Sequence, residues 1–189
     1  NTMEHLDSNC PIISFEREIA ENIPTVLCDN YQGGILAANR LIDAGCQNVA
    51  ILNHPAKEST PAYRREQAFL KCCETRNVSA RVIYAEAMTS LAEDFGQNIL
   101  KLMEENSDLD GIFATSDVIA AHIIRACGKI GKKVPEDISI IGFNDTWIST
   151  LTNPSITAVH QPVKEMCECA IDAILKKING EKVSSQIVF

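Results

Sequence analysis

The sequence predicts an α/β protein in which parallel sheets are covered by helices, and two observations support this fold class. Short β-branched runs alternate with segments whose apolar residues recur at helical spacing. The β-branched runs are mostly apolar on both faces, which is typical of parallel strands buried between helices. The predicted strands cover 11–15, 25–28, 49–52, 81–84, 111–115 and 138–143, and a short final strand is predicted at 186–189.

Helices are predicted where apolar residues recur every three or four positions between these strands. The first covers 33–44, and the last begins after Pro162 and stops at Gly180. Between them, 91–102 has the same periodicity, and 118–127 (VIAAHIIRAC) is apolar nearly all round. Strands and helices in this alternation predict βαβ units with right-handed crossovers.

The two ends of the chain depart from this alternation. The segment through Asn30 supplies two strands with no helix of comparable length between them, and the segment from Thr157 supplies an extended run, a helix and a final strand. A chain that starts in one lobe, builds a second and returns to the first produces this order. The sequence therefore predicts two lobes, 1–30 with 159–189 and 31–158, with a cleft between them.

Composition excludes several classes of protein. Seventeen Lys and Arg against 25 Asp and Glu give a net charge of −8, which repels a phosphate backbone, so the chain alone is expected to bind nucleic acid poorly. No apolar run approaches the ~20 residues of a membrane helix. The eight cysteines lie mostly in apolar runs and include no C-x-x-C. We therefore expect buried free thiols in a reducing, cytoplasmic setting, and no metal site.

The residues that follow each strand form the candidate site, because ligands of open α/β sheets bind beyond the carboxyl ends of the strands. Carboxylates, amides and hydroxyls can donate to and accept from several hydroxyls of a sugar or polyol. Aromatic faces at Phe15, Tyr63 or Trp147 could stack on a sugar ring. The polar residues after the strands are Glu16, Arg17, Asp29, Asn30, Asn53, His54, Glu86, Ser116, Asp117, Asn144 and Asp145.

The same residue types are common helix N-caps, so Ser116 and Asp117 each have an alternative role as a cap. Asn144 and Asp145 are better candidates, because a turn follows them rather than an obvious helix. The sequence holds no G-x-S-x-G, P-loop or G-x-G-x-x-G motif, and His122 falls on an apolar helix with no assignable nucleophile. We therefore expect a binding protein without a cofactor rather than an enzyme.

Three stretches of the chain carry a family resemblance. They are IPTVLCDNYQGGILAANRLIDAGCQNVAIL, DGIFATSDVIAAHIIRACGKIGKKVPEDISIIGFNDTWIS and LTNPSITAVHQP. The most specific piece is VPEDISIIGFND followed by the P-x-[IL]-T-x-[VI]-x-Q pattern of Pro154 to Gln161. These stretches resemble the effector-binding and dimerisation region of the LacI/GalR family of bacterial transcription regulators.

The resemblance implies a periplasmic-binding-protein-like type I fold of two parallel-sheet lobes, with the N-terminal lobe incomplete. It implies that a sugar or related small metabolite binds in the interlobe cleft as an effector, and that the protein forms a homodimer. Family members also carry a helix-turn-helix and a hinge segment before this region. Operator DNA would then be bound only through that missing headpiece.

The resemblance also assigns residues to the effector site. Glu16 and Arg17 are similar to the Asp-Arg pair that often follows the equivalent strand. Arg65 matches the second basic position of an R-x-R-x-x-G pattern. Tyr63 stands where an effector-contacting Arg is usual, and Ala68 replaces the Gly.

Two further family motifs are changed at one residue each. Ser116 takes the place of Asn in an A-N-D triplet, and Asp117 is retained. Asn144 replaces the first Asp of F-D-D, and Asp145 is retained. Gln161 closes the most specific motif and completes this side of the expected site. Charged or bidentate groups are replaced by neutral or aromatic ones, so the expected effector differs from a typical hexose.

The same resemblance implies a subunit interface made by the helix 118–127 and the loop that holds Trp147, Ile148 and Leu151. Alternatively, the helix is buried within its own lobe and Trp147 lines the cleft as an effector contact. Effector binding would favour one lobe orientation with a coupling of ~1–3 kcal/mol and so alter headpiece spacing on DNA. Two other functions stay open, a periplasmic sugar-binding protein and an α/β enzyme without a recognisable motif. The number of free cysteines disfavours the periplasm.

Overall fold

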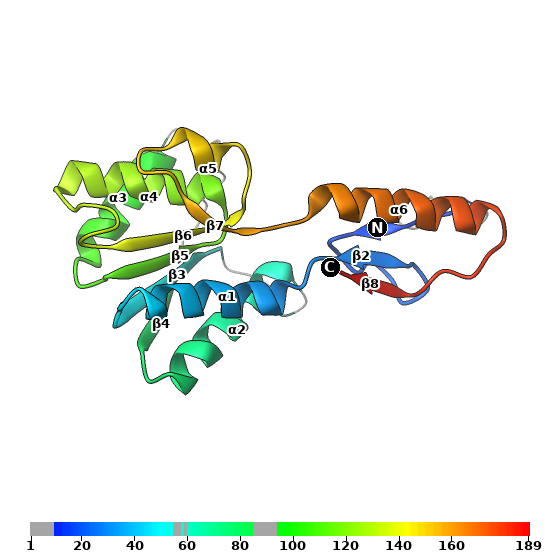
Figure 1. The fold of residues 1–189 in the computed structure, drawn as a ribbon, viewed down its shortest axis with the longest axis horizontal. Helices are drawn as coiled ribbons and strands as arrows, with labels where there is room; N and C mark the ends of the chain where they lie inside the picture. Colours follow the sequence, from blue (N-terminus) through cyan, green and yellow to red (C-terminus); the bar gives the residue numbers. More distant parts are fainter. Residues whose placement is uncertain (1–9, 55–57, 59, 85–93) are drawn as a thin grey trace. The chain divides into compact units, whose positions relative to one another are not determined.

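The computed structural model describes residues 10–54, 58, 60–84 and 94–189, and the chain divides into two compact units. The smaller unit is Asn1–Asp29 with Pro162–Phe189, and the larger unit is Asn30–Gln161 (Figure 1). Each unit has its own parallel sheet. Asn30 and residues 159–161, which the sequence analysis assigned to the smaller lobe, lie in the larger unit. Asn30 begins a helix of that unit, and 159–160 belong to a strand of its sheet.

A five-stranded parallel sheet forms the centre of the larger unit. Its strands are β3 (Asn48–Asn53), β4 (Ser79–Tyr84), β5 (Gly111–Ala114), β6 (Ser139–Asn144) and β7 (Thr157–His160). They lie in the order β4-β3-β5-β6-β7, and the register places Phe113 of β5 beside both Ile51 of β3 and Ile141 of β6. β3, β5 and β6 are buried along most of their length, which explains their continuous apolar sequence.

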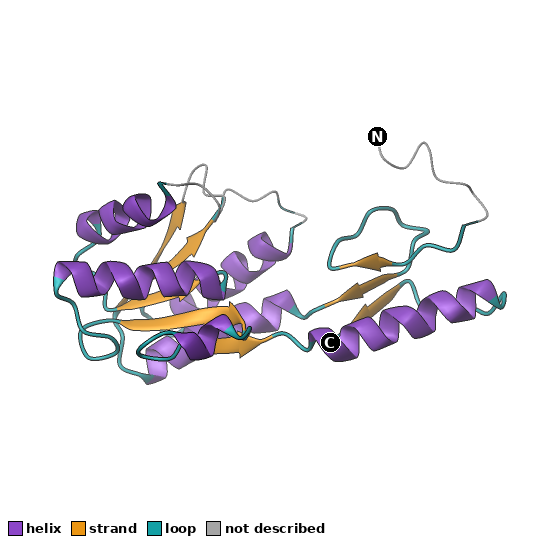
Figure 2. Cartoon of the chain, turned by 90° about the horizontal axis from the view of Figure 1, so that it is seen from above, coloured by secondary structure: helices purple, strands orange, loops and turns teal. Residues whose placement is uncertain are grey.

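In the described part of this unit, helices cover both faces of the sheet (Figures 1 and 2). The helices are α1 (Asn30–Asp43), α2 (Pro61–Thr75), α3 (Phe95–Glu105), α4 (Asp117–Ile130) and the short α5 (Ile148–Leu151). α1 packs against α2 on one face, α3 packs against α4 on the other, and α5 contacts α4. The predicted helices at 33–44, 91–102 and 118–127 correspond to α1, α3 and α4, although α3 begins at Phe95 and 91–93 lie outside the described residues.

The main hydrophobic core lies between the sheet and the helices α3 and α4. Phe95 and Ile99 of α3 share it with Ile123 of α4 and Ile112 of β5, and none of the four is more than 2% exposed. Burying such a side chain contributes about 1.5–3 kcal/mol, so these contacts hold α3 and α4 to the sheet. The positions of the strand ends follow from this packing.

Aromatic side chains fill the opposite face of the sheet. The Phe113 ring lies 5.6 Å from that of Phe69 on α2 and 6.4 Å from that of Phe143 on β6, measured between centroids. α1 fits over this cluster because Gly33 has no side chain: a Cβ there would lie 2.8 Å from Cε2 of Phe143. The close approach of α1 to β6 therefore depends on glycine at this position.

In residues 10–29 and 162–189, the described part of the smaller unit, there are three parallel strands and one helix. They are β1 (Ser14–Phe15), β2 (Thr25–Leu27), β8 (Gln186–Val188) and α6 (Val163–Ile178). The strands lie in the order β1-β2-β8, and α6 contacts the buried strand β2. The predicted strand at 11–15 is shorter in the structure, because only Ser14 and Phe15 pair with β2. No helix separates β1 from β2, as the sequence analysis expected.

The sequence analysis named no helix between β3 and β4, where the structure has α2. Thr60 is the N-cap of α2, and its hydroxyl oxygen accepts a hydrogen bond from the backbone N–H of Tyr63 at 3.3 Å. Pro61 follows in the first turn, where its missing N–H has no cost. The helix was missed because charged and polar residues interrupt its apolar stripe.

The cysteines are less uniformly buried than the sequence analysis expected. All eight are free, but only Cys46, Cys73 and Cys127 are buried, whereas Cys10 and Cys167 are exposed. Burial raises the pKa of Cys73 to about 12 and the pKa of Cys127 to about 11. Among the helices of the described residues, none is long and apolar enough to cross a membrane.

Candidate functional site

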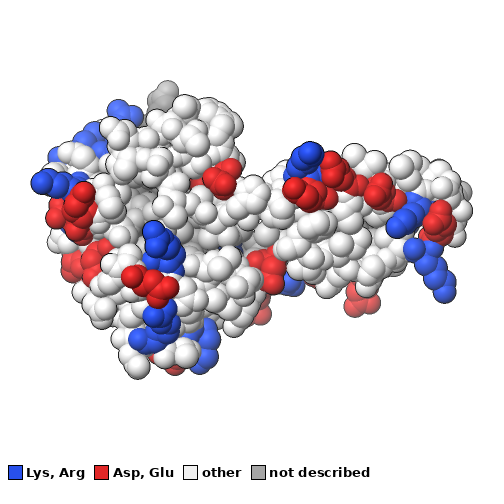
Figure 3. Space-filling model, viewed as in Figure 1, with Lys and Arg blue, Asp and Glu red and all other residues white. Residues whose placement is uncertain are grey.

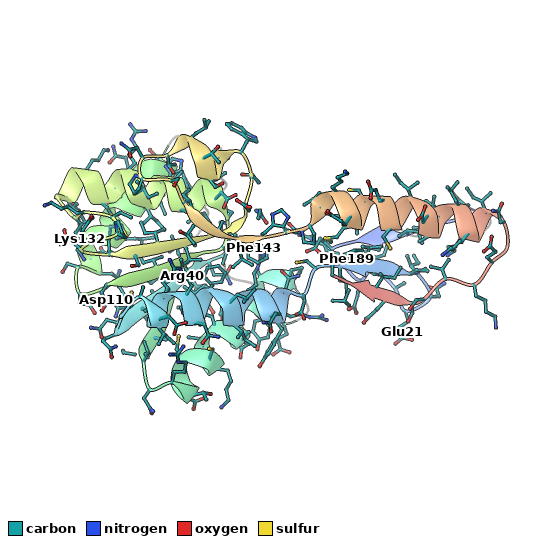
Figure 4. The ribbon with its side chains drawn as sticks, in the orientation of Figure 1. Glu21, Arg40, Asp110, Lys132, Phe143 and Phe189 are labelled. Atoms are coloured by element: carbon teal, nitrogen blue, oxygen red, sulfur yellow. The ribbon has the colours of Figure 1, made fainter. Side chains whose placement is uncertain are left out.

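The polar residues that follow the strands of the larger unit share one edge of its sheet, because all five strands are parallel. We call this the carboxyl edge, and it is marked by the last residues of β3, β4, β6 and β7. The register places Asn53 of β3 beside Tyr84 of β4, and Asn144 of β6 beside His160 of β7. Phe143, labelled in Figure 4, lies one residue before the end of β6.

The turn after β6 has an unusual backbone. Asn144 has φ 101° and Asp145 has φ 57°, so two consecutive non-glycine residues adopt the left-handed region. Oδ1 of Asp145 accepts a hydrogen bond from the Ser149 hydroxyl at 3.2 Å, and Oδ2 lies 3.1 Å from Nδ1 of His160. The backbone N–H of Gln161 donates to the carbonyl oxygen of Asn144 at 3.3 Å. The turn therefore brings three expected site residues together.

Asp117 holds this turn from the first position of α4. Its Oδ2 accepts hydrogen bonds from the backbone N–H of Thr146 at 2.6 Å and from the Thr146 hydroxyl at 2.9 Å. The residue is only 1% exposed, and its Oδ1 has no hydrogen-bond partner within the described part of the chain. Ser116 is the N-cap of α4, and its hydroxyl oxygen accepts from the N–H of Ile119 at 3.3 Å. Ser116 thus has the capping contact that the alternative interpretation expected, whereas Asp117 is not the cap and instead binds the turn after β6.

Arg65 reaches the same edge from α2. Its Cζ lies 3.9 Å from the centroid of the Phe143 ring, so the guanidinium stacks on the aromatic face. Such cation–π contacts contribute about 0.5–2 kcal/mol and fix the orientation of the group. Tyr63, half-buried, lies two residues earlier in the first turn of the helix. The carboxyl edge therefore combines a guanidinium and a phenol with carboxylate and amide groups.

Glu66 and Tyr84 are among the residues of this edge that the sequence analysis missed. Glu66 is 3% exposed, and its carboxylate accepts hydrogen bonds from Nδ2 of Asn53 at 2.9 Å and from the Tyr84 hydroxyl at 3.0 Å. Burial, and next the hydrogen bond to Glu66, raise the pKa of Tyr84. A charged residue inside a polar helix gives no sequence signal of burial, whereas the position of Tyr84 at a strand end is a signal that could have been used.

At the opposite edge of the same sheet, charged side chains form hydrogen bonds with backbone groups. Asp110 accepts hydrogen bonds from the backbone N–H groups of Gln47 at 2.8 Å and Asn48 at 2.9 Å. Lys132 donates to the carbonyl oxygen of Leu109 at 3.0 Å (Figure 4 labels Asp110 and Lys132). These side chains tie down neighbouring backbone. The carboxyl edge is the better candidate for ligand binding.

In the smaller unit, Glu16 and Arg17 follow β1 as expected. Glu16 has a left-handed φ of 61°, and its Oε1 accepts a hydrogen bond from the backbone N–H of Cys28 at 2.6 Å. The Ser14 hydroxyl donates to the carbonyl oxygen of Arg17. These contacts brace the turn after β1 against the end of β2, and the Arg17 residue is exposed.

Several other residues named in the sequence analysis are exposed, packed against a neighbour or outside the described residues. Trp147 precedes α5 and is 71% exposed, and Phe15 is 39% exposed. Glu86 lies outside the described residues. His122 packs edge-on against Phe95 with ring centroids 4.6 Å apart, and burial lowers its pKa, so its environment is that of a packed histidine. Within the described residues, no three His, Cys, Asp or Glu side chains group as a metal site requires.

The polar side chains of the carboxyl edge can donate hydrogen bonds to neutral hydroxyl groups and accept hydrogen bonds from them. The carboxylates and amides accept or donate in fixed directions, and the Phe143–Arg65 stack supplies a rigid cationic donor. Such a small set of oriented polar groups beside aromatic side chains is typical of small-molecule sites.

Comparison with known proteins gives a consistent result. Residues 38–188 match the family model of the periplasmic binding protein-like domain. The ribose operon repressor of Halalkalibacterium halodurans is 34% identical over 183 residues, which are 96% of this chain and 54% of that protein. Catabolite control protein A of Priestia megaterium is 28% identical over 192 residues, covering 99% of this chain and 58% of that protein. The chain spans about half the length of the relatives it matches.

A solved structure shares the fold over nearly the whole chain. It is the periplasmic binding protein/LacI transcriptional regulator from Alkaliphilus metalliredigens, complexed with D-xylulofuranose. The two superpose with a TM-score of 0.86 at 28% sequence identity, covering 99% of this chain and 70% of the other.

Proposed function

Because the chain belongs to the periplasmic binding protein-like domain family, and its relatives include LacI-family repressors, we propose that it is the effector-sensing domain of a bacterial transcription regulator. The proposed effector is a sugar or a related polyhydroxylated metabolite, bound in an interlobe cleft by the residues after β1, β5 and β6 together with Tyr63 and Arg65 of α2. The relative that was solved with D-xylulofuranose supports this class of ligand.

The turn after β6 is the observation that carries this proposal. Left-handed backbone at non-glycine residues costs of order 1–3 kcal/mol each and persists only where the surrounding structure holds it, often at ligand sites. At Asn144 and Asp145 the hydrogen bonds from Thr146 to Asp117 and from Ser149 to Asp145 hold it. The amide and the carboxylate are therefore preorganised to bind hydroxyl groups before a ligand arrives.

Calorimetric titration with D-ribose, D-xylulose, sucrose, lactose and cellobiose tests this proposal. We expect saturable binding of at least one sugar. Asn144→Ala and Asp145→Ala should each weaken that binding by about 1–3 kcal/mol, because a buried hydrogen bond to the sugar is lost. Glu136→Ala is the matched control, since Glu136 is exposed and precedes β6 at the other edge of the sheet. Absence of sugar binding, or unchanged affinity in both variants, would contradict the proposal.

We further propose that the chain forms a homodimer through α4 and the α5 loop. Trp147 and Leu151 are 71% and 70% exposed, which is unusual for large apolar side chains, and α5 contacts α4. Sedimentation equilibrium should give a dimer for the wild type and a monomer for Trp147→Glu with Leu151→Glu. A monomeric wild type, or a variant that stays dimeric, would exclude this interface.

The proposed mechanism is allosteric. Effector binding would favour one relative orientation of the lobes, and the dimer would transmit this change to helix-turn-helix headpieces in the rest of a longer, cytoplasmic protein. On the face that Figure 3 shows, Lys and Arg are interspersed with Asp and Glu. Within α6, Nζ of Lys164 lies 3.9 Å from Oε1 of Glu168. With a net charge of −8, the 189-residue chain should not bind operator DNA by itself.

A further inference from the structure

Glu66 is a buried charge that no part of the proposed effector site explains. A carboxylate taken out of water loses several kcal/mol of hydration unless hydrogen bonds replace it. Here the replacements come from two different strands: Nδ2 of Asn53 donates to Oε2 at 2.9 Å, and the Tyr84 hydroxyl donates to Oε1 at 3.0 Å. The carboxylate therefore joins α2 to the ends of β3 and β4.

Asn53 uses every polar atom of its side chain in this region. Besides Glu66, its Nδ2 donates to the carbonyl oxygen of Ala62 at 3.3 Å, and its Oδ1 accepts from the N–H of His54 at 2.9 Å. Ala62 and Glu66 are four residues apart, so they lie one turn apart on the same side of the helix. Two attachment points one turn apart fix both the position and the rotation of the helix about its axis.

A different side of α2 is held by α1. A Cβ at Gly34 would overlap the carbonyl oxygen of Arg65 and would lie 2.9 Å from Cβ of Ala68, so the two helix backbones are in contact. Side-chain hydrogen bonds on one side and direct backbone packing on another leave the first two turns of α2 little freedom. Those two turns carry Tyr63 and Arg65.

We propose that Glu66, with Asn53 and Tyr84, is a positioning residue of the effector site: its buried carboxylate holds the first two turns of α2 so that Tyr63 and Arg65 meet the ligand. This inference rests on the proposed sugar-sensing function. Glu66 itself contacts no ligand in this account, because it is buried at 3% exposed and both of its oxygens are engaged within the protein. Tyr84, at 48% exposed, is the accessible end of the network.

Two mild variants test the inference on the full chain. Tyr84→Phe removes one hydroxyl from a half-exposed ring, and Glu66→Gln keeps the shape of the side chain but changes one acceptor into a donor. Tyr31→Phe is the matched control, because Tyr31 is 49% exposed and its hydroxyl makes no hydrogen bond to the described part of the chain. Each variant is assayed by calorimetry with the five sugars named above and by hydrogen exchange of the 63–66 amides without ligand.

We expect Tyr84→Phe to weaken sugar binding by about threefold to tenfold, the loss of one hydrogen bond to a positioned element. Exchange of the 63–66 amides should accelerate by a similar factor. Glu66→Gln should act in the same direction on both readouts, and Tyr31→Phe should change neither.

Three other outcomes have defined meanings. If the variants melt at lower temperature but bind sugar with wild-type affinity when folded, the network is only stabilising and the inference is overturned. Unchanged amide exchange overturns it as well. If the wild type binds none of the sugars, the proposed function fails and the effector role of Glu66 fails with it, while amide exchange still decides whether the network holds α2.

Discussion

β6 and α4 each contain one glycine, Gly142 and Gly128. Replacing Gly142 with alanine should destabilise the protein more than the same replacement at Gly128. Gly142 lies in β6, two residues before the proposed binding turn. A Cβ at this position would lie 2.7 Å from Oδ1 of Asp117 and 2.8 Å from Cγ2 of Ile156, where ordinary contacts begin near 3.4 Å. Asp117 is 1% exposed and Ile156 is 8% exposed, so neither can move into solvent.

The magnitude follows from two contributions. Overpacking a rigid core by one methyl group costs about 1–3 kcal/mol. Displacing Asp117 also weakens its hydrogen bonds to Thr146, and a hydrogen bond to a charged group contributes about 1.5–3 kcal/mol. Because the displacement is partial, we expect a loss of about 2–4 kcal/mol in the free energy of unfolding, or about 5–15 °C in melting temperature.

Urea denaturation followed by circular dichroism measures this loss, and Gly128→Ala provides the control. Gly128 lies in α4, and a Cβ there would meet no described atom within 4 Å. Alanine at this helical site should stabilise the protein by about 0.5–1 kcal/mol. The reasoning would be refuted if Gly142→Ala matched the wild type within 0.5 kcal/mol, as an order-of-magnitude bound, or if both alanine variants changed stability in the same direction.

Three further predictions concern buried thiols and the brace of the turn. With Ellman's reagent, the exposed Cys10 and Cys167 should react at once in the folded protein. The buried Cys73 and Cys127 should react only on unfolding, and fast labelling of all cysteines would contradict this prediction. The pKa of Cys127 is raised from 9.0 to about 11, so the unfolded chain loses this proton first and stability should fall between pH 9 and pH 11 by about 3 kcal/mol, a slope that Cys127→Ala should reduce in denaturation curves. Asp117→Ala should lower the free energy of unfolding by about 2–4 kcal/mol in urea titrations, because the buried N–H and hydroxyl that it binds lose their acceptor, and a loss below about 1 kcal/mol would argue against the brace.

The strands β3, β5 and β6 of the larger unit could be predicted from sequence because their burial is nearly continuous. Ile51, Phe113 and Ile141 sit in runs that are apolar on both faces, and that pattern arises only where helices cover both sides of a sheet. The limit of this approach appears at β1, where five residues were predicted and two pair. Apolar composition indicates burial, but pairing also requires a neighbouring strand of the same length.

Helix prediction failed where the helix is polar. α2 carries RREQ at 64–67, so its buried apolar positions Ala68, Phe69 and Cys73 were too few to stand out. Its start was nevertheless encoded in Thr60 and Pro61, an N-cap followed by a first-turn proline. A search for capping residues, rather than for apolar periodicity, would have located this helix.

The candidate site was predictable in place but not in detail. Parallel strands bring their ends to one edge, so Asp145 and Asn144 could be named from position alone. Their left-handed backbone could not be, because it depends on hydrogen bonds from Thr146 to a distant Asp117. The burial of Glu66 was likewise invisible, since it follows from the meeting of α2 with two strand ends.

A titration followed by nitrogen-15 NMR tests the central claim most directly, because it reports where a ligand binds as well as whether it binds. D-ribose, D-xylulose and the three disaccharides are added separately to the labelled chain. The account predicts that at least one sugar produces saturable shifts centred on the amides of Arg65, Ser116, Asn144 and Asp145, with little change at Asp110 and Lys132. Saturable shifts centred on the opposite edge of the sheet, or no saturable shift with any sugar, would contradict it.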